Sequence, residues 1–353
     1  MPLSLPAFSG VYVFGDSLVD PGNAYEAAKA LGQIPGLPLP GAAPTAEDGY
    51  FLHRFTDGYN FADLVANKFL GVPQKTTFPY GLKDPVFGIP VPVGGRPDGN
   101  NLSFAYGGAQ IRGGEPIPDF DKQTDAYRNF PSGDPNALYL VTFGGNDVRE
   151  LAPEDGNPVT GAEASGALAA AAAEMADEVQ QLFQFGARHI LMTGVPQVGV
   201  VPEYAGSVNE AARRALATDY SHRLDALVKD ALSRVVLPEG ASLYSYSLMD
   251  YAASVFADPA AHHFFNLTDP RQEAQPDQLS TAGSGFLFFD KVHPSAQAHA
   301  QVAAGIVDFF TGAGPDTPQP LQAGPRTLGA IEQFAGADDF TAALAAGHTY
   351  VFD

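Results

Sequence analysis

Short apolar runs alternate along this chain with helix-forming stretches, and this alternation restricts the possible folds more than any other feature. Five runs have the composition of strands buried on both faces, at residues 11–14, 102–106, 138–143, 190–195 and 243–246. Helices are predicted at residues 24–31, 163–185, 209–235 and 295–310. The pattern favours an α/β fold with a mainly parallel, five-stranded sheet and helices on both faces, in which ligands bind beyond the carboxyl ends of the strands.

Three stretches rich in proline and glycine interrupt the alternation, at residues 33–49, 71–100 and 258–285. Long loops of this kind often form the rim of a binding site, and the alternative is a surface excursion. After Phe310 the sequence Thr-Gly-Ala-Gly-Pro-Asp-Thr-Pro-Gln-Pro has the composition of a linker. We therefore expect one main domain over residues 1–312, followed by a linker and C-terminal extension over residues 313–353.

The composition argues against several classes of protein. The 353 residues contain 40 acidic and 19 basic side chains, and the net charge of −21 argues against a nucleic-acid partner. Cysteine is absent, which excludes disulfides, thiolate metal sites and a cysteine nucleophile. No apolar run has the ~18 residues of a transmembrane helix. Neither a nucleotide-binding glycine motif nor an H-E-x-x-H zinc motif occurs, so we expect no cofactor and no metal site.

Two polar motifs lie at predicted ends of secondary-structure elements. Val-Phe-Gly-Asp-Ser-Leu, residues 13–18, places Ser17 directly after a buried strand, where it could attack a substrate or simply form a turn. In Phe-Asp-Lys-Val-His-Pro, residues 289–294, Asp290 and His293 are three residues apart, a spacing that lets the carboxylate orient the imidazole. The alternative is a surface histidine beside an aspartate. The proline of this motif suits the start of the last predicted helix, which would hold the pair rigidly.

Two glycine pairs offer hydrogen-bond donors at other strand ends. Gly-Gly-Asn-Asp, residues 144–147, supplies the neutral amide of Asn146, which can stabilise an oxyanion. Ser-Phe-Ala-Tyr-Gly-Gly-Ala, residues 103–109, contains a pair that offers a backbone N–H group. Gly-Gly-Asn-Asp is also an ordinary turn sequence. Together the four motifs contain a nucleophile, a base, an orienting acid and oxyanion donors, which are the parts that serine acyl transfer needs.

These motifs, in this order and at these separations, resemble the four sequence blocks of the GDSL or SGNH hydrolase family over residues 8–312. Residues 53–66 are also similar to a segment of the longer, lipase-like members of that family. The resemblance implies a three-layer αβα sandwich similar to flavodoxin. It also implies that Ser17 is the nucleophile, that His293 is the general base and acid, and that Asp290 orients His293.

The resemblance further implies an oxyanion hole. Its donors would be the backbone N–H groups of Ser17 and Gly108 and the side-chain amide of Asn146. Gly107 is the alternative donor, since a glycine pair leaves the register open. Ser103 stands where many members of the family have asparagine, so the hydrogen bonding around the glycine pair is an open question.

The implied function is hydrolysis of carboxylic esters by a serine esterase or lipase through an acyl-enzyme intermediate, without a cofactor. Acyl transfer and carbohydrate O-deacetylation at the same site are the alternative activities, and an inactive binding module on the hydrolase scaffold is the alternative of another class. The expected substrate is a small neutral ester or lipid, because the negative charge repels polyanions. Eight aromatic residues of the long loops either form an acyl pocket or pack those loops: Phe51, Phe55, Phe78, Tyr80, Phe87, Phe264, Phe265 and Phe286.

Residues 337–353 resemble the opening of a β-rich module found in large secreted bacterial proteins with calcium-binding repeats. Such proteins often leave the cell by type I secretion. The N-terminal residues lack the basic and apolar regions of a conventional signal peptide. We therefore expect a bacterial, extracellular enzyme. The alternative for these residues is a capping strand of the hydrolase domain.

Overall fold

A computed structural model describes residues 7–32, 43–80, 95–113, 117–278 and 285–311. The predicted linker and C-terminal extension over residues 313–353 lie outside the described residues, as do parts of the three long stretches rich in proline and glycine. Within the described part of the chain, no helix is both long and apolar enough to cross a membrane.

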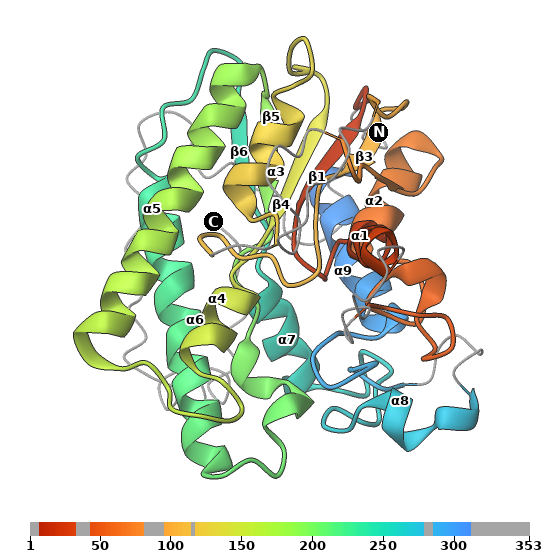
Figure 1. Cartoon of the computed structure of the whole chain (residues 1–353), viewed down its shortest axis with the longest axis vertical. Coiled ribbons are helices and arrows are strands. Elements are labelled where there is room, and N and C mark those ends of the chain that lie inside the picture. The colour runs from red at the N-terminus through yellow and green to blue at the C-terminus, as the bar shows by residue number, and fades with distance from the viewer. Residues whose placement is uncertain (1–6, 33–42, 81–94, 114–116, 279–284, 312–353) are drawn as a thin grey trace.

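The centre of the molecule is a parallel sheet with the strand order β2-β3-β1-β4-β5-β6 (Figure 1). Its strands are β1 (Val11–Gly15), β2 (Lys75–Thr76), β3 (Asn101–Ser103), β4 (Leu138–Thr142), β5 (His189–Met192) and β6 (Ser242–Ser245). The parallel sheet and the α/β class confirm the prediction, but the sheet has six strands rather than five. The additional strand, β2, lies in a stretch predicted as a loop, because two residues at a sheet edge leave no apolar run to recognise.

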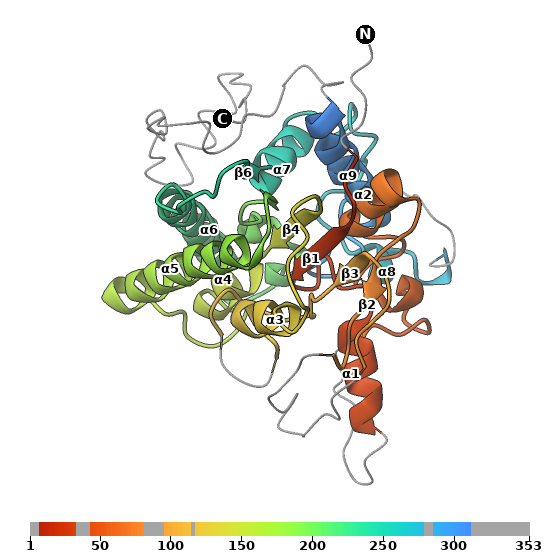
Figure 2. The same cartoon turned by 90° about the horizontal axis from the view of Figure 1, so that it is seen from above.

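The side chains of β1 alternate between the two faces of the sheet. Val11 and Val13 pack on one side, Tyr12 and Phe14 pack on the other, and all four are buried. The first side is covered by α2 (Phe61–Leu70) and α9 (Ala296–Thr311). The second side is covered by α3 (Phe120–Tyr127), α5 (Gly161–Phe185) and α6 (Glu210–Leu232). Figure 2 shows the resulting three layers, which confirm the predicted αβα arrangement.

The other helices follow strands or lie in the connections. They are α1 (Asn23–Gly32), α4 (Gly145–Leu151), α7 (Leu248–Ala257) and α8 (Arg271–Ala274), with the 3-10 turns η1 (Phe51–His53), η2 (Val198–Val200), η3 (Pro202–Tyr204) and η4 (Pro276–Gln278). At the carboxyl end of the sheet Gly15 of β1 pairs with Thr142 of β4. The turn after β1 therefore lies beside the start of α4, which brings two of the sequence motifs together.

Candidate active site

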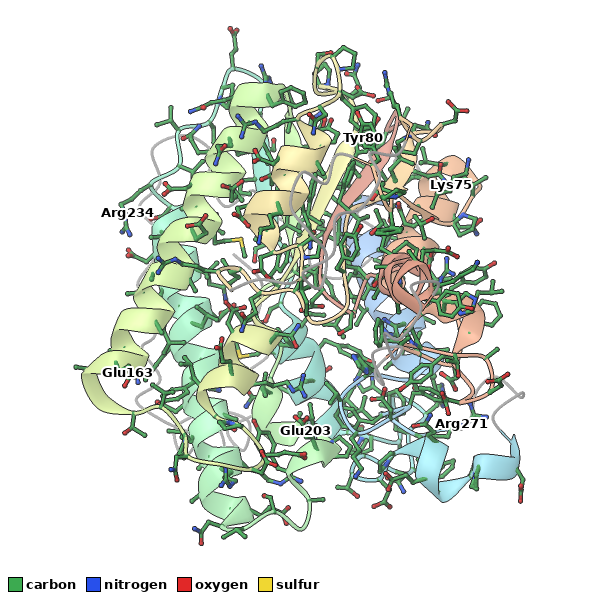
Figure 3. All side chains as sticks on the ribbon, viewed as in Figure 1. Lys75, Tyr80, Glu163, Glu203, Arg234 and Arg271 are labelled. Carbon is green, nitrogen blue, oxygen red and sulfur yellow. The ribbon has the colours of Figure 1, made fainter. Side chains whose placement is uncertain are left out.

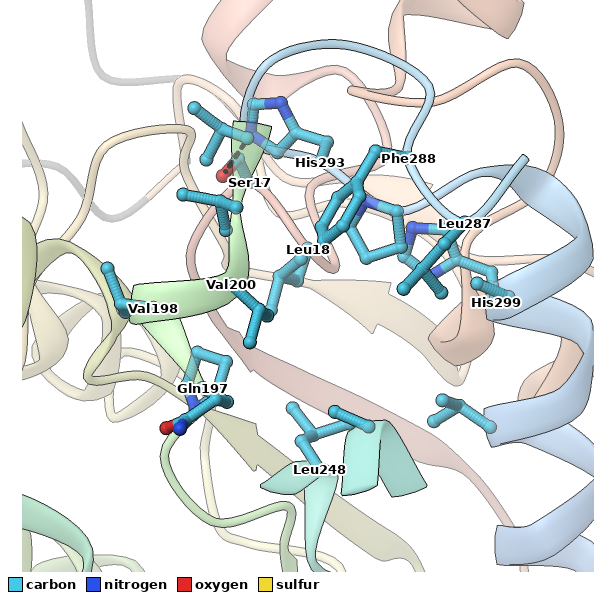
Figure 4. A pocket seen from close by; sticks show the side chains of 18 of the residues that line it. Ser17, Leu18, Gln197, Val198, Val200, Leu248, Leu287, Phe288, His293 and His299 are labelled. Carbon is cyan, nitrogen blue, oxygen red and sulfur yellow. Dashed lines mark hydrogen bonds between the residues drawn. The ribbon is translucent and has the colours of Figure 1, made fainter. Parts of the chain in front are cut away.

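The side chains of Ser17, His293 and Asp290 meet beyond the carboxyl end of β1. Ser17 Oγ lies 2.8 Å from His293 Nε2 (Figure 4), and His293 Nδ1 lies 2.7 Å from Asp290 Oδ2. An ionised carboxylate only accepts hydrogen bonds, so Nδ1 carries the ring proton. Nε2 is therefore left to accept the hydrogen of the serine hydroxyl.

Asp290 accepts hydrogen bonds on both oxygens. Oδ1 accepts the backbone N–H groups of Val292 and His293 at 2.8 and 2.6 Å. Oδ2 accepts from His293 Nδ1 and, at 2.9 Å, from the hydroxyl of Tyr50. Burial alone raises the pKa of Asp290, but the charge of His293 and the hydrogen bonds from His293 and Val292 bring the net pKa below its usual value. The carboxylate is therefore ionised and holds the imidazole in one orientation.

The backbone before Ser17 is fixed by α3. Gly15 N–H donates to Gln123 Oε1, and Gln123 Nε2 donates to the carbonyl oxygen of Gly15, both at 2.8 Å. A side chain at position 15 would overlap Val19 and come within 2.7 Å of the carbonyl oxygen of Thr142. Glycine is therefore required where β1 leaves the sheet, and the turn presents Ser17 at a fixed position.

The segment that contains Tyr50 and Phe55 packs on the loop that carries His293, although it lies far from this loop in the sequence. The ring of Phe55 lies against the ring of His293, with centroids 5.1 Å apart, and Tyr50 binds Asp290 as described above. Residues 53–66 were recognised in the sequence as a family segment. Neither contact was predicted, because aromatic residues in a loop give no periodic pattern from which a partner can be inferred.

The same segment is tied to the start of α9. Thr56 Oγ1 donates to the carbonyl oxygen of Pro294 at 2.9 Å, and Asp57 Oδ1 accepts the N–H of Ala296 at 2.7 Å. Asp57 also forms an ion pair with Arg271, whose side chain is fully buried; Figure 3 labels Arg271. Buried charges are found in pairs because an isolated one is expensive to remove from water. This pair therefore fixes the segment on which the histidine loop rests.

The two glycines of the 103–109 motif have different surroundings. Gly107 N–H donates to Asp20 Oδ2 at 2.9 Å, whereas the N–H of Gly108 has no acceptor among the described residues. Gly108 has a φ of 85°, and a Cβ there would lie 2.7 Å from Cδ1 of Ile117. Of the two glycines, Gly108 is the one whose N–H is available to a substrate.

Asn146 lies in the first turn of α4 and is held from two sides. Its Nδ2 donates to the carbonyl oxygen of Ala109 at 2.9 Å, and its Oδ1 accepts from Arg149 at 3.2 Å. Within the described residues, the second amide hydrogen has no acceptor. Arg149 is itself fixed by Glu203 of η3, with 2.8 Å between Nε and Oε2; Figure 3 labels Glu203. The sequence predicted Asn146 as a donor but gave no sign of Arg149 or Glu203.

With serine at position 103, the backbone before the glycine pair is held by hydrogen bonds from Ser103 itself and from Asn23. Its hydroxyl donates to the carbonyl oxygen of Val19 at 3.2 Å. Asn23 at the start of α1 donates from Nδ2 to the carbonyl oxygens of Ser103 and Ala105 at 2.8 and 2.9 Å. The strand that leads to the glycine pair is therefore tied to the motif after β1, with a serine at position 103.

A cavity of about 110 Å³ is lined by Ser17, His293 and Asn146 and continues past Leu18; Figure 4 shows Ser17, Leu18 and His293 in its wall. Its wall is mainly aliphatic. None of the described loop aromatics proposed for an acyl pocket lines it, and Phe87 lies outside the described residues. Among the described residues, no group of three or more histidine, aspartate or glutamate side chains is placed to hold a metal ion.

Comparison with known proteins identifies the family. The model of the GDSL-like lipases and acylhydrolases matches residues 11–306. The chain belongs to this family. The match confirms the resemblance seen in the four sequence blocks, and it covers the sheet and the helices on both its faces.

Individual relatives of this GDSL-like protein are distant. An acetylajmalan esterase of Rauvolfia serpentina is 26% identical over 265 residues, which cover 67% of this chain and 69% of that protein. A GDSL esterase/lipase of Arabidopsis thaliana is 31% identical over 147 residues, or 39% of this chain and 36% of that one. The solved acetylxylan esterase Axe2 of Geobacillus stearothermophilus is 14% identical with a TM-score of 0.40, covering 87% and 96%. The matches span 36% to 59% of the Arabidopsis relatives.

Proposed function

We propose that this chain is a carboxylic ester hydrolase with Ser17 as its nucleophile. The observation that carries the proposal is the continuous chain of hydrogen bonds from Ser17 Oγ through His293 to Asp290. A serine hydroxyl is a weak nucleophile unless a neighbouring base takes its proton, and His293 Nε2 is 2.8 Å away with its lone pair toward the hydroxyl.

In the proposed first step, Ser17 Oγ attacks the ester carbonyl carbon while its proton passes to His293 Nε2. The carbonyl oxygen takes the negative charge and is stabilised by the N–H groups of Ser17 and Gly108 and by the amide of Asn146. The bond from carbon to the alcohol oxygen then breaks, and His293 returns the proton to the leaving alcohol. In the second step water attacks the acyl-enzyme with His293 again as base, which releases the acid and restores Ser17.

The test measures hydrolysis of p-nitrophenyl acetate and labelling by an organophosphonate. We expect the wild type to turn over the ester and to gain one phosphonyl group on Ser17. Ser17→Ala should lose a factor of about 10⁴ to 10⁶ in kcat with an unchanged circular dichroism spectrum. Ser165→Ala, at an exposed serine of α5, is the matched control. Full activity in Ser17→Ala, or a wild type inert toward esters and the phosphonate, would overturn the proposal, and the second result would favour a binding module.

Acyl transfer remains the alternative at the same site. It differs from hydrolysis only in whether water or an acceptor alcohol attacks the acyl-enzyme. Product analysis with and without added alcohols or xylo-oligosaccharides separates the two, because a transferase forms a new ester while a hydrolase forms only the free acid.

We propose, on separate grounds, that the enzyme acts outside the cell. The support is the net charge of −21, the absence of cysteine and the resemblance of residues 337–353, which lie outside the described residues, to a module of secreted proteins. The test is the share of Ser17-dependent activity in the medium of a bacterial host that carries a type I exporter. Activity confined to the cells would contradict export by this route.

A further inference from the structure

The cavity beside Ser17 continues well beyond the groups that would perform the chemistry. It runs past Leu18 between the segment of η2, the start of α7 and the inner face of α9 (Figure 4). Its wall is formed mostly by side chains without a polar atom, including Val198, Val200, Leu248, Leu287, Phe288 and Val302. These residues come from four separate parts of the chain, so the cavity is a feature of the folded domain.

The polar side chains on the wall beyond Ser17 are few and bring no unpaired charge. Two of them are neutral: the Oε1 of Gln197 has no hydrogen-bond partner among the described residues, and the hydroxyl of Tyr251 donates to Gln301 Oε1 at 3.3 Å. Arg149 is held in an ion pair by Glu203. His299 is 2% exposed, its Nδ1 accepts the N–H of Phe61 at 3.3 Å, and burial followed by the charge of His293 lowers its pKa to about 3. His299 is therefore neutral near pH 7. A sugar or a charged headgroup would exchange its bonds with water for an aliphatic surface, which is costly, whereas a hydrocarbon gains by leaving water.

We propose that this cavity holds the hydrocarbon acyl chain of the substrate, so that the enzyme prefers medium-chain carboxylic esters to acetates. The proposal rests on the ester hydrolase function given above. Ser17, His293 and Asn146 line the cavity together with its apolar residues, so a hydrocarbon held there lies next to the carbonyl under attack. The chain then stays in the cavity in the acyl-enzyme after the alcohol has left.

The volume limits the length of that chain. At ~10 to 15 Å³ for a group of the size of a water molecule, 110 Å³ holds roughly seven to eleven such groups. This is far below the ~300 to 1,000 Å³ of pockets for drug-sized ligands. An acyl chain of up to roughly seven to eleven carbons therefore fits in the cavity, and part of a palmitoyl chain would have to stay outside it.

The first experiment compares two ester series with the wild-type protein. In p-nitrophenyl acetate, butyrate, hexanoate, octanoate and palmitate only the acyl part changes, and we expect kcat/KM to rise by up to about fourfold for each methylene and then fall at palmitate. In methyl, butyl and octyl acetate only the alcohol changes, and we expect a nearly flat series. A flat acyl series, or a rise confined to the alcohol series, would overturn the assignment of the cavity to the acyl chain.

The second experiment fills the cavity. Ala252 of α7 lines it, whereas Ala257 at the end of the same helix is exposed. Ala252→Leu should lower the ratio of kcat/KM for octanoate to that for acetate at least tenfold, and Ala257→Leu should leave the ratio unchanged. Val200→Phe, in the part of the wall formed by η2, should lower the same ratio and serves if Ala252→Leu does not fold.

The outcomes separate the two proposals. If acetate is hydrolysed in a Ser17-dependent manner but neither filling variant changes the ratio, the acyl cavity is wrong and the hydrolase stands. If no ester in either series is hydrolysed, the hydrolase proposal itself fails.

Discussion

Tyr50 donates its hydroxyl hydrogen to Oδ2 of Asp290 across 2.9 Å, although 240 positions separate the two residues in the sequence. The same oxygen accepts the hydrogen bond of His293. Burial, together with the neighbouring charge of Asp290, raises the pKa of Tyr50 far above its usual value, so the hydroxyl is a donor at every working pH. Asp290 therefore depends on a residue outside the four sequence blocks for its full set of hydrogen bonds.

Removing this donor tests its contribution. In Tyr50→Phe the buried carboxylate of Asp290 loses one hydrogen-bond donor, while the volume of the ring is kept. We expect a loss of about 1 to 3 kcal/mol in the free energy of unfolding. We also expect kcat/KM to fall roughly tenfold, since one pK unit of lost stabilisation is worth about 1.4 kcal/mol. Urea unfolding and p-nitrophenyl butyrate kinetics measure the two effects. Tyr59→Phe, at an exposed tyrosine, is the control. Unchanged values in Tyr50→Phe would show that Asp290 does not use this bond.

Asn146 is predicted to stabilise the oxyanion. Asn146→Ala should lower kcat by about 10² to 10³, or ~3 to 4 kcal/mol of barrier, with little change in KM, because the charge on oxygen develops only in the transition state. Asn129→Ala, at a surface asparagine that binds only its own helix end, should have no effect. Steady-state kinetics decide the matter, and a rise in KM without a fall in kcat would assign Asn146 to ground-state binding instead.

The buried pair of Arg271 and Asp57 is predicted to be costly to break. Arg271→Ala leaves the Asp57 carboxylate buried without its cation, and we expect a loss of about 3 to 5 kcal/mol in the free energy of unfolding. Replacing both residues, as Asp57→Asn with Arg271→Met, should recover part of the loss. The exposed pair of Arg234 and Asp230 is the control, where Arg234→Ala should cost less than ~1 kcal/mol. Equal losses in urea unfolding for the two arginine variants would contradict the prediction.

Buried His299 should make stability depend on pH. Its folded pKa of about 3 lies below the usual 6.5, so the unfolded chain binds a proton over this range while the folded protein does not. Stability is therefore full above pH 6.5 and falls as the pH decreases toward 3, by about 2 kcal/mol at pH 5. His299→Asn keeps an acceptor for the N–H of Phe61 and removes this titration. The difference in unfolding free energy between wild type and variant should shrink by that amount from pH 7.5 to 5, and a constant difference would show that His299 does not titrate as described.

The parts of the structure that the sequence predicted are those with a repeating local pattern. The runs that became β1 and β4 are almost wholly apolar, with Thr142 the polar side chain of β4, because both faces of the sheet are covered. Helices α5 and α6 are long enough to be recognised. By contrast, β2 is too short to carry a pattern. Helix α2 was not predicted, since its start depends on the reciprocal capping of Asn60 and Asp63 inside a loop-like sequence.

Some residues of the candidate site could likewise be predicted from the sequence, and others could not. The four blocks brought Ser17, Asn146 and the pair of Asp290 and His293 to attention, because chemistry restricts those residue types and their strand-end positions. Tyr50 and Arg149 could not be found by such reasoning, since they act through contacts that only the folded chain creates. The cavity beside Ser17 could not be predicted, because its wall is built from single residues scattered over many elements, and none of the described loop aromatics lines it.

The place of β1 in the strand order has a consequence for synthesis. This strand is made first but lies in the middle of the sheet, between β3 and β4, so an emerging chain cannot cover its two edges until more than a third of the protein has been translated. Ser17 then waits for His293, 276 positions later. With Ser17 as the proposed nucleophile, the pair of Ser17 and His293 cannot form until His293 has left the exit tunnel of the ribosome. A chain terminated before His293 would therefore be inert toward the esters of the cell that makes it.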